Sequence, residues 1–158
     1  FIHNNIFVVE TLNLYTNLIS ESNLYQHERK AMTTELFYLW MSGLVLIVAT
    51  LIQQLTSLFN VGLMPVLGSR EDVKFTGMTG RLERAILNSV IAMALITPAI
   101  VILHLLAITN ASTVLAVQIF LTARIVYIIS YGIGIMGLRS AGWITSLLSI
   151  LWLYYSAV

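Results

Sequence analysis

The chain contains no cysteine and few charged side chains. Of its 158 residues, 9% are charged and 58% are hydrophobic, and the mean hydropathy is +0.89. The absence of cysteine excludes disulfide frameworks, thiolate nucleophiles and cysteine-based zinc or redox sites. The scarcity of charge and the high hydropathy are unlike the balance of a soluble domain, and they predict an integral membrane protein.

Several familiar kinds of polar site are also missing from the sequence. The net charge is +1 and the eight lysines and arginines are scattered, so there is no basic patch of the kind that nucleic-acid binding requires. No Ser/His/Asp set, phosphate-binding loop or cluster of metal ligands is present. Haem ligation by two histidines would need a partner for His104 within the membrane, but His3 and His27 lie near the N-terminus. We therefore interpret His104 as a satisfied core or interface residue.

Four apolar segments predict transmembrane helices, at residues 36–59, 82–108, 113–136 and 143–155. A span needs roughly 20 apolar residues, so a chain of this length has room for four spans, a polar N-terminal segment and one substantial loop. We expect an all-α integral membrane protein folded as a four-transmembrane-helix bundle. The segment "GLRSAG", residues 137–142, has the composition of the last turn.

The distribution of basic residues predicts the orientation of this bundle. The loops at 60–81 and 137–142 carry or adjoin most of the arginines and lysines, whereas the opposite side has only Arg29 and Lys30. By the positive-inside rule, both basic loops face the cytosol or matrix and both termini face away from it. A bacterial inner membrane and an organelle membrane are equally compatible with this pattern.

Residues 1–31 form a separate segment with mixed composition, and 32–158 form the membrane domain. Val8, Leu12, Tyr15 and Ile19 recur at helical spacing among polar residues, which predicts a short amphipathic helix. The segment is interpreted either as a docking element for a membrane surface or neighbouring protein, or as a tail packed on its own bundle.

Arg124 is the most informative polar residue in the predicted spans. It lies about 12 residues from either end of the third span, or roughly 18 Å at 1.5 Å per residue, which is too deep for snorkelling alone to hydrate its guanidinium. It must face the bundle interior, a water-filled cleft or an anionic ligand. The alternative is a structural arginine paired with a carboxylate or with backbone carbonyls, and Glu83 is the one carboxylate within the predicted bundle.

Two tyrosines share a helical face with this arginine. Tyr127 and Tyr131 follow Arg124 at i+3 and i+7, so the three side chains form a stripe on one side of the third span. Alone they are typical of core or interface aromatics, but beside a buried arginine they can hydrogen-bond a polar ligand.

The second span begins with another polar face. Arg84 and Asn88 lie one turn apart and Arg81 lies one turn earlier, so these side chains either line a polar cleft or cap the inner end of the helix. Arg139, after the third span, is either part of the same site or a positive-inside anchor.

Two spaced motifs resemble the signatures of the MAPEG family, the membrane-associated proteins of eicosanoid and glutathione metabolism. The match covers residues 32–158, and "MTTEL" at 32–36 looks like the start of bacterial-type members. The second-span motif is met by Arg81, Arg84-Ala85, Asn88 and Pro98. The third-span motif is met by Ala123-Arg124, Tyr127, Tyr131 and Arg139.

This resemblance implies a homotrimer with glutathione held between neighbouring subunits near the cytosolic face, and a transferase or peroxidase activity on lipophilic substrates. The residues that would hold the tripeptide are Arg84, Asn88, Arg124, Tyr127 and Tyr131. Arg139 would be the catalytic residue that stabilises the thiolate, because a nearby cation lowers the pKa of a thiol. The two carboxylates of glutathione also suit guanidinium groups, which bind carboxylates bidentately.

The sequence departs from the family pattern at two places. Ile91 stands where the family has an acidic residue, and Gln53 and Gln54 stand where many members have an arginine. Ile91 and the added residues 1–31 motivate a second interpretation beside the first, in which the chain is a non-catalytic accessory subunit of a larger membrane complex.

Overall fold

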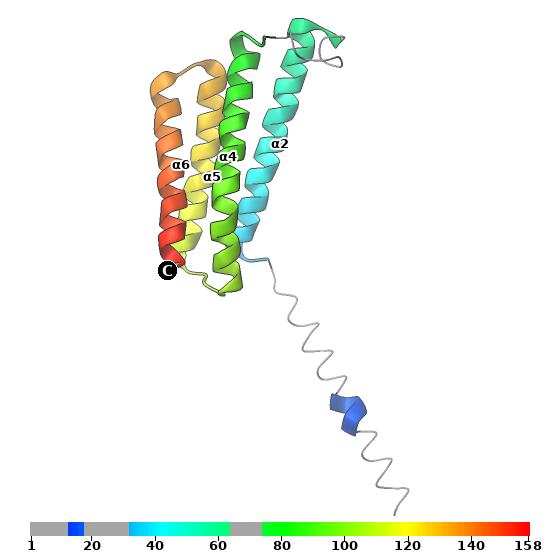
Figure 1. Cartoon of the computed structure of the whole chain (residues 1–158), viewed down its shortest axis with the longest axis vertical. Helices are drawn as coiled ribbons and strands as arrows, with labels where there is room; N and C mark the ends of the chain where they lie inside the picture. Colours follow the sequence, from blue (N-terminus) through cyan, green and yellow to red (C-terminus); the bar gives the residue numbers. More distant parts are fainter. Residues whose placement is uncertain (1–12, 18–31, 64–73) are drawn as a thin grey trace, which may run out of the picture. The chain divides into compact units, whose positions relative to one another are not determined.

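The structure is a computed structural model that describes residues 13–17, 32–63 and 74–158 (Figure 1). The chain divides into two compact units, Phe1–Met32 and Thr33–Val158. In the first unit, residues 13–17 are helical and exposed, so Tyr15 of the predicted amphipathic helix is in a helical stretch. The other apolar positions of that predicted helix lie outside the described residues.

Four helices build the second unit: α2 (Thr34–Val61), α4 (Gly77–Leu105), α5 (Ala111–Ile133) and α6 (Met136–Ser156). Successive helices run in opposite directions and lie side by side (Figure 1). α4 and α5 contact each other, and both pack against α2 on one side and α6 on the other. The pairing of α5 with α6 is the most extensive of these contacts.

Among the described residues, three helices are long and apolar enough to cross a membrane: α2, α4 and α5. Three of the predicted spans are thus confirmed as suitable helices. The described part of the chain is all-helical, and the chain is a multi-pass membrane protein. The fourth predicted span, 143–155, lies inside α6. α6 contains Arg139 and the buried serines Ser146 and Ser149, which lower its mean hydropathy. It is therefore not among the three helices that are apolar enough to cross a membrane.

The prediction of a turn at residues 137–142 is wrong, because these residues lie inside α6. α5 instead ends at Ile133, and its C-cap residue Gly134 has a φ of 92°, in the left-handed region that commonly terminates helices. The two glycines of the 137–142 segment are typical of a turn. Here Gly142 instead allows two helices to pack closely.

One apolar core cluster joins α2, α4 and α5 through Ala49, Leu82, Ala85, Tyr127 and Ile128. The larger apolar core cluster lies between α4, α5 and α6. The buried residues that form it are Ala92, Ile96, Ala99, Ile100 and Leu103 of α4, Ala116, Val117 and Phe120 of α5, and Ile150 and Leu153 of α6. Large apolar side chains also cover outer helix faces, for example Leu51 at 63% exposed and Leu87 at 60%. Such apolar outer surfaces match the hydrocarbon solvent of a bilayer.

A buried carboxyl group connects α2 to the turn between α4 and α5. Glu35 is 2% exposed, and its two oxygens accept hydrogen bonds from Thr109 Oγ1 at 2.8 Å and Thr113 Oγ1 at 2.6 Å. The same turn is closed by the Asn110 side chain, which caps α5 through the amides of Ser112 and Thr113. The expectation that Glu83 is the one carboxylate within the bundle is therefore wrong.

The hydrogen bonding of His104 differs from what the sequence predicts. This side chain is partly buried on α4 at the helix end near this turn, but its Nδ1 atom is buried without a hydrogen-bond partner among the described residues. The histidine therefore belongs to the bundle but is not fully satisfied.

Whether α6 crosses the membrane decides the side on which the C-terminus lies. Because the chain has no cysteine, Ala111→Cys, Met136→Cys and Val158→Cys can each be labelled without background by an impermeant maleimide. All three side chains are exposed. We expect Met136→Cys to react from the cytosolic or matrix side, and Ala111→Cys and Val158→Cys to react from the opposite side. Labelling of Val158→Cys and Met136→Cys from the same side would show that α6 does not cross the membrane, so the chain would have three spans.

Candidate functional site

Four of the predicted site residues converge on one cavity. Asn88 of α4, Tyr127 and Tyr131 of α5 and Arg139 of α6 line a space of about 310 Å³. α6 also supplies Ser140, Trp143 and Ile144 to its walls. Three helices that are separated in the sequence thus combine hydroxyl, amide and guanidinium groups in one place.

Tyr127 is the best-fixed member of this cavity. It is 2% exposed, its Oη atom accepts a 3.0 Å hydrogen bond from Asn88 Nδ2, and its ring packs edge-on against Tyr131 with centroids 5.5 Å apart. Because the Tyr127 oxygen accepts this bond, its own O–H group remains a donor for a ligand. The amide of Asn88 therefore helps to orient the tyrosine and borders the same cavity.

Arg139 supplies a positive charge near the N-terminus of α6. Its guanidinium carbon lies 4.8 Å from the centroid of the Tyr131 ring, a cation–π distance that holds the side chain at the cavity wall. α6 begins at Met136 without a hydrogen bond from a capping side chain. The helix dipole therefore adds to the guanidinium charge, and this end of the cavity favours an anion.

Arg124 borders a second cavity next to the first. It is 4% exposed, its Nη2 donates to Ser146 Oγ of α6, and its guanidinium lies 4.9 Å from the Tyr127 ring centroid and 5.8 Å from that of Phe120. The second cavity has a volume of about 250 Å³ and shares Asn88 with the first. Arg124 thus supports Tyr127 from the interior side of the bundle.

The guanidinium of Arg124 is only partly satisfied. Its Nε and Nη1 atoms are buried with no hydrogen-bond partner, and it makes no ion pair with either of the two acidic residues that the structure describes, Glu35 and Glu83. The alternative of a structural arginine held by a carboxylate therefore finds no support in the described part of the chain.

The two arginines at the start of α4 have different roles. Arg81 Nε donates a 2.9 Å hydrogen bond to the carbonyl oxygen of Gly132 near the end of α5, so it fastens α4 to α5 and satisfies a helix-end carbonyl. Arg84 is exposed and lies outside the walls of both cavities. It remains one turn from Asn88 on the same helix.

Gly142 sets the distance between α5 and α6. A Cβ atom at this position would lie 3.0 Å from the carbonyl oxygen of Ala123 and 3.2 Å from Tyr127 Cβ. A larger residue would force these neighbours to shift, so glycine favours this close approach of the two backbones, and the approach places Ser146, one turn later, against Arg124. Sequence reasoning missed Ser146 and Trp143. The sequence contains one signal for Ser146: it lies one turn after Gly142, in the span that follows the predicted buried arginine.

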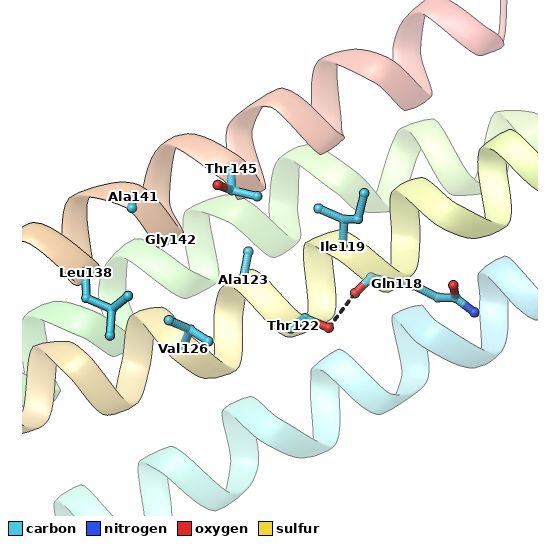
Figure 2. Close-up of a pocket in the computed structure, with 9 residues that line it drawn as sticks. All are labelled: Gln118, Ile119, Thr122, Ala123, Val126, Leu138, Ala141, Gly142 and Thr145. Carbon is cyan, nitrogen blue, oxygen red and sulfur yellow. Dashed lines mark hydrogen bonds between the residues drawn. The ribbon is translucent and has the colours of Figure 1, made fainter.

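A third space opens between α5 and α6, and Figure 2 shows the residues around it. It has a volume of about 380 Å³, and Gln118, Thr122 and Thr145 are its polar members. Gln118 Nε2 donates to Tyr38 Oη at 3.1 Å, and Thr122 Oγ1 donates to the Gln118 carbonyl oxygen at 2.9 Å. None of the predicted site residues lines this space, so we do not regard it as the functional site.

The fold and site define a helical, multi-pass membrane protein with a polar cavity formed by α4, α5 and α6. A family model described as the MAPEG family matches residues 32–158. Because this match includes all four helices of the second unit, the chain belongs to the MAPEG family. No curated protein and no solved structure matched the chain.

Two glycines of α6 provide a matched test of the α5–α6 contact. Gly142→Ala should destabilise the bundle by about 1–3 kcal/mol, because the added methyl group overpacks against Ala123 and Tyr127. Gly137→Ala, where nothing lies within 4 Å of the new Cβ, should be neutral or stabilising by up to about 1 kcal/mol. Thermal unfolding in detergent measures both variants, and equal midpoints would contradict the assigned role of Gly142.

Proposed function

We propose that this protein binds glutathione at the cavity lined by Asn88, Tyr127, Tyr131 and Arg139. The observation that carries this proposal is the convergence of these four side chains on one cavity. Membership of the MAPEG family supports a connection with glutathione. The donors present also suit a tripeptide with two carboxylates and two amide carbonyls.

Arg139 is proposed as the residue that acts on the thiol. A guanidinium beside the sulfur, together with the N-terminus of α6, stabilises the thiolate and lowers the thiol pKa. The Tyr127 hydroxyl can donate a further hydrogen bond to the same ligand. A thiolate in this position would act on lipophilic substrates that arrive from the bilayer in one of two ways. It would form a bond to an electrophilic carbon as a leaving group departs, or it would reduce a hydroperoxide to an alcohol and water while two glutathione thiols are oxidised to the disulfide.

We further propose that the site is completed in a homotrimer of four-span subunits. The cavity of about 310 Å³ is at the lower end of the range of roughly 300–1,000 Å³ that encloses a drug-sized ligand. Glutathione is a flexible tripeptide, so one subunit would supply one wall and a neighbouring copy would supply the rest. Arg84, exposed one turn before Asn88, would bind a glutathione carboxylate at the mouth, and Arg124 would support Tyr127.

A non-catalytic role as an accessory subunit is the second candidate, and Ile91 is the observation that favours it. This side chain is 58% exposed and lines the cavity beside Arg124, so the position of the family's acidic residue offers no charge to the amine of glutathione. As an accessory subunit, the chain would keep the family fold and join a larger membrane complex through residues 1–31. We also propose that the chain is a bacterial-type member of the family, that it lies in a bacterial inner membrane or an organelle membrane, and that both termini face away from the cytosol or matrix.

Glutathione binding to the purified protein tests the first candidate. We expect Arg139→Leu to abolish thiolate absorbance and to weaken binding about 10-fold or more, because a charge-assisted hydrogen bond contributes about 1.5–3 kcal/mol. The matched control is Lys74→Leu, which removes the same charge from an exposed position before α4 and should leave binding unchanged. Calorimetry measures affinity, and ultraviolet difference spectra report thiolate.

Three outcomes separate the candidates. Thiolate formation with turnover of an electrophile or a hydroperoxide supports the enzyme. Binding without turnover, or recovery of the protein as a stoichiometric part of a larger complex, supports the accessory subunit. Equal binding by Arg139→Leu and by the natural protein would reject the proposed site.

A further inference from the structure

The positive charge of Arg124 is buried without a negative charge that compensates it. The side chain is 4% exposed, and its Nε and Nη1 atoms have no hydrogen-bond partner within the described residues. Of the two acidic residues that the structure describes, Glu35 has both oxygens engaged by threonines near the α4–α5 turn, and Glu83 makes no ion pair with Arg124. A cation in a poorly hydrated bundle is costly unless it meets an anion.

The cavity beside Arg124 presents hydrogen-bond donors and no negative charge. Its volume is about 250 Å³, and the polar residues of its wall are Arg124, Asn88 and Trp143. Asn88 Nδ2 gives one N–H group to Tyr127 and keeps the other, and the indole of Trp143 is a donor only. Among the side chains that line the cavity, the Asn88 carbonyl is the one acceptor. Donors that surround a buried cation favour an anion in the space between them.

An anion can reach Arg124 along a polar route. The two cavities share Asn88 and Trp143, and the first also contains Arg139 near the N-terminus of α6. The guanidinium of Arg139 and the dipole of α6 both attract negative charge to that end of the bundle. An ion that enters there passes from Arg139 to Arg124 along polar side chains, so it does not have to cross the hydrocarbon of the bilayer.

We propose that the cavity beside Arg124 binds a chloride ion, with the guanidinium as its main ligand. Charge balance selects a monoanion, because one cation is neutralised by one negative charge, whereas sulfate would add an unpaired charge. The other wall residues are apolar: Ile91, Ala92, Leu95, Leu147 and Ile150. Such walls favour a monatomic ion, because it brings no further polar groups that they would leave without a partner.

The bound ion supports the neighbouring polar cavity through Tyr127. The guanidinium of Arg124 lies 4.9 Å from the centroid of the Tyr127 ring, and this tyrosine lines the other cavity. An ion that neutralises and holds the guanidinium therefore also fixes the ring. Chloride in this position has the role of an internal carboxylate, which Ile91 at the same cavity cannot supply. The inference goes beyond the proposed function and does not depend on it.

Binding of radioactive chloride by the full chain in phosphatidylcholine nanodiscs tests the proposal, with empty nanodiscs subtracted. We expect saturable binding that excess bromide displaces and excess sulfate does not. Ile91→Glu should weaken chloride binding at least about 10-fold, because it supplies an internal carboxylate at the same cavity. Ile91→Gln, which has the same shape without the charge, should bind chloride within about 3-fold of the natural protein.

Thermal unfolding of the same samples gives a second measurement. The unfolding midpoint of the natural protein should be higher in chloride than in gluconate at equal ionic strength, because a ligand that binds the folded state stabilises it. Gluconate is also a monoanion, but its hydroxyl groups do not suit the apolar walls. The midpoint of Ile91→Glu should be the same in both salts, since its own carboxylate replaces the ion.

Each alternative has its own result. Absence of saturable chloride binding, or equal midpoints of the natural protein in chloride and gluconate, would overturn the proposal. Unchanged chloride binding in Ile91→Glu would place the ion at another cation and reject this site. Displacement by glutathione would assign the charge of Arg124 to the glutathione site instead. Glutathione binding measured in gluconate keeps the two proposals separable, because its failure alone leaves chloride binding intact.

Discussion

A guanidinium buried at membrane depth is the constraint on which this bundle depends. Arg124 cannot be hydrated from the middle of α5, so the helices around it must supply contacts. Ser146 of α6 accepts one of its hydrogen bonds, and the rings of Phe120 and Tyr127 cover its face. This arrangement requires α6 to lie very close to α5, and Gly142 makes that approach possible. The position of Tyr127, and so of the polar cavity, follows from the same contact.

Polar groups at the two ends of the bundle have different tasks. Glu35 and the two threonines near the α4–α5 turn satisfy one another and join α2 to the rest of the fold. Near the opposite helix ends, Arg139 lies against the face of Tyr131 and borders an open cavity. The first cluster is closed and structural, whereas the second keeps donors available. That difference is why we place the function among α4, α5 and α6.

The parts of the fold that were predictable follow from periodicity and length. Long apolar runs identified three membrane helices, and the i+3 and i+7 spacing placed Tyr127 and Tyr131 on the face of Arg124. The boundary between α5 and α6 was not predictable, because glycines are typical of both turns and close helix contacts. Ser146 and the threonine partners of Glu35 were also missed, since their hydrogen-bond partners lie more than 20 positions away. Trp143 was missed because its role depends on side chains of α4 and α5.

The central claim is that α4, α5 and α6 form one wall of a glutathione site that a neighbouring copy completes. An electron cryomicroscopy map of the purified protein with glutathione tests it most directly. The account predicts a three-fold assembly with ligand density within hydrogen-bond distance of Arg139 and Tyr127, closed on its far side by the next subunit. A monomer, or an assembly in which this cavity faces lipid and holds no density, would contradict it.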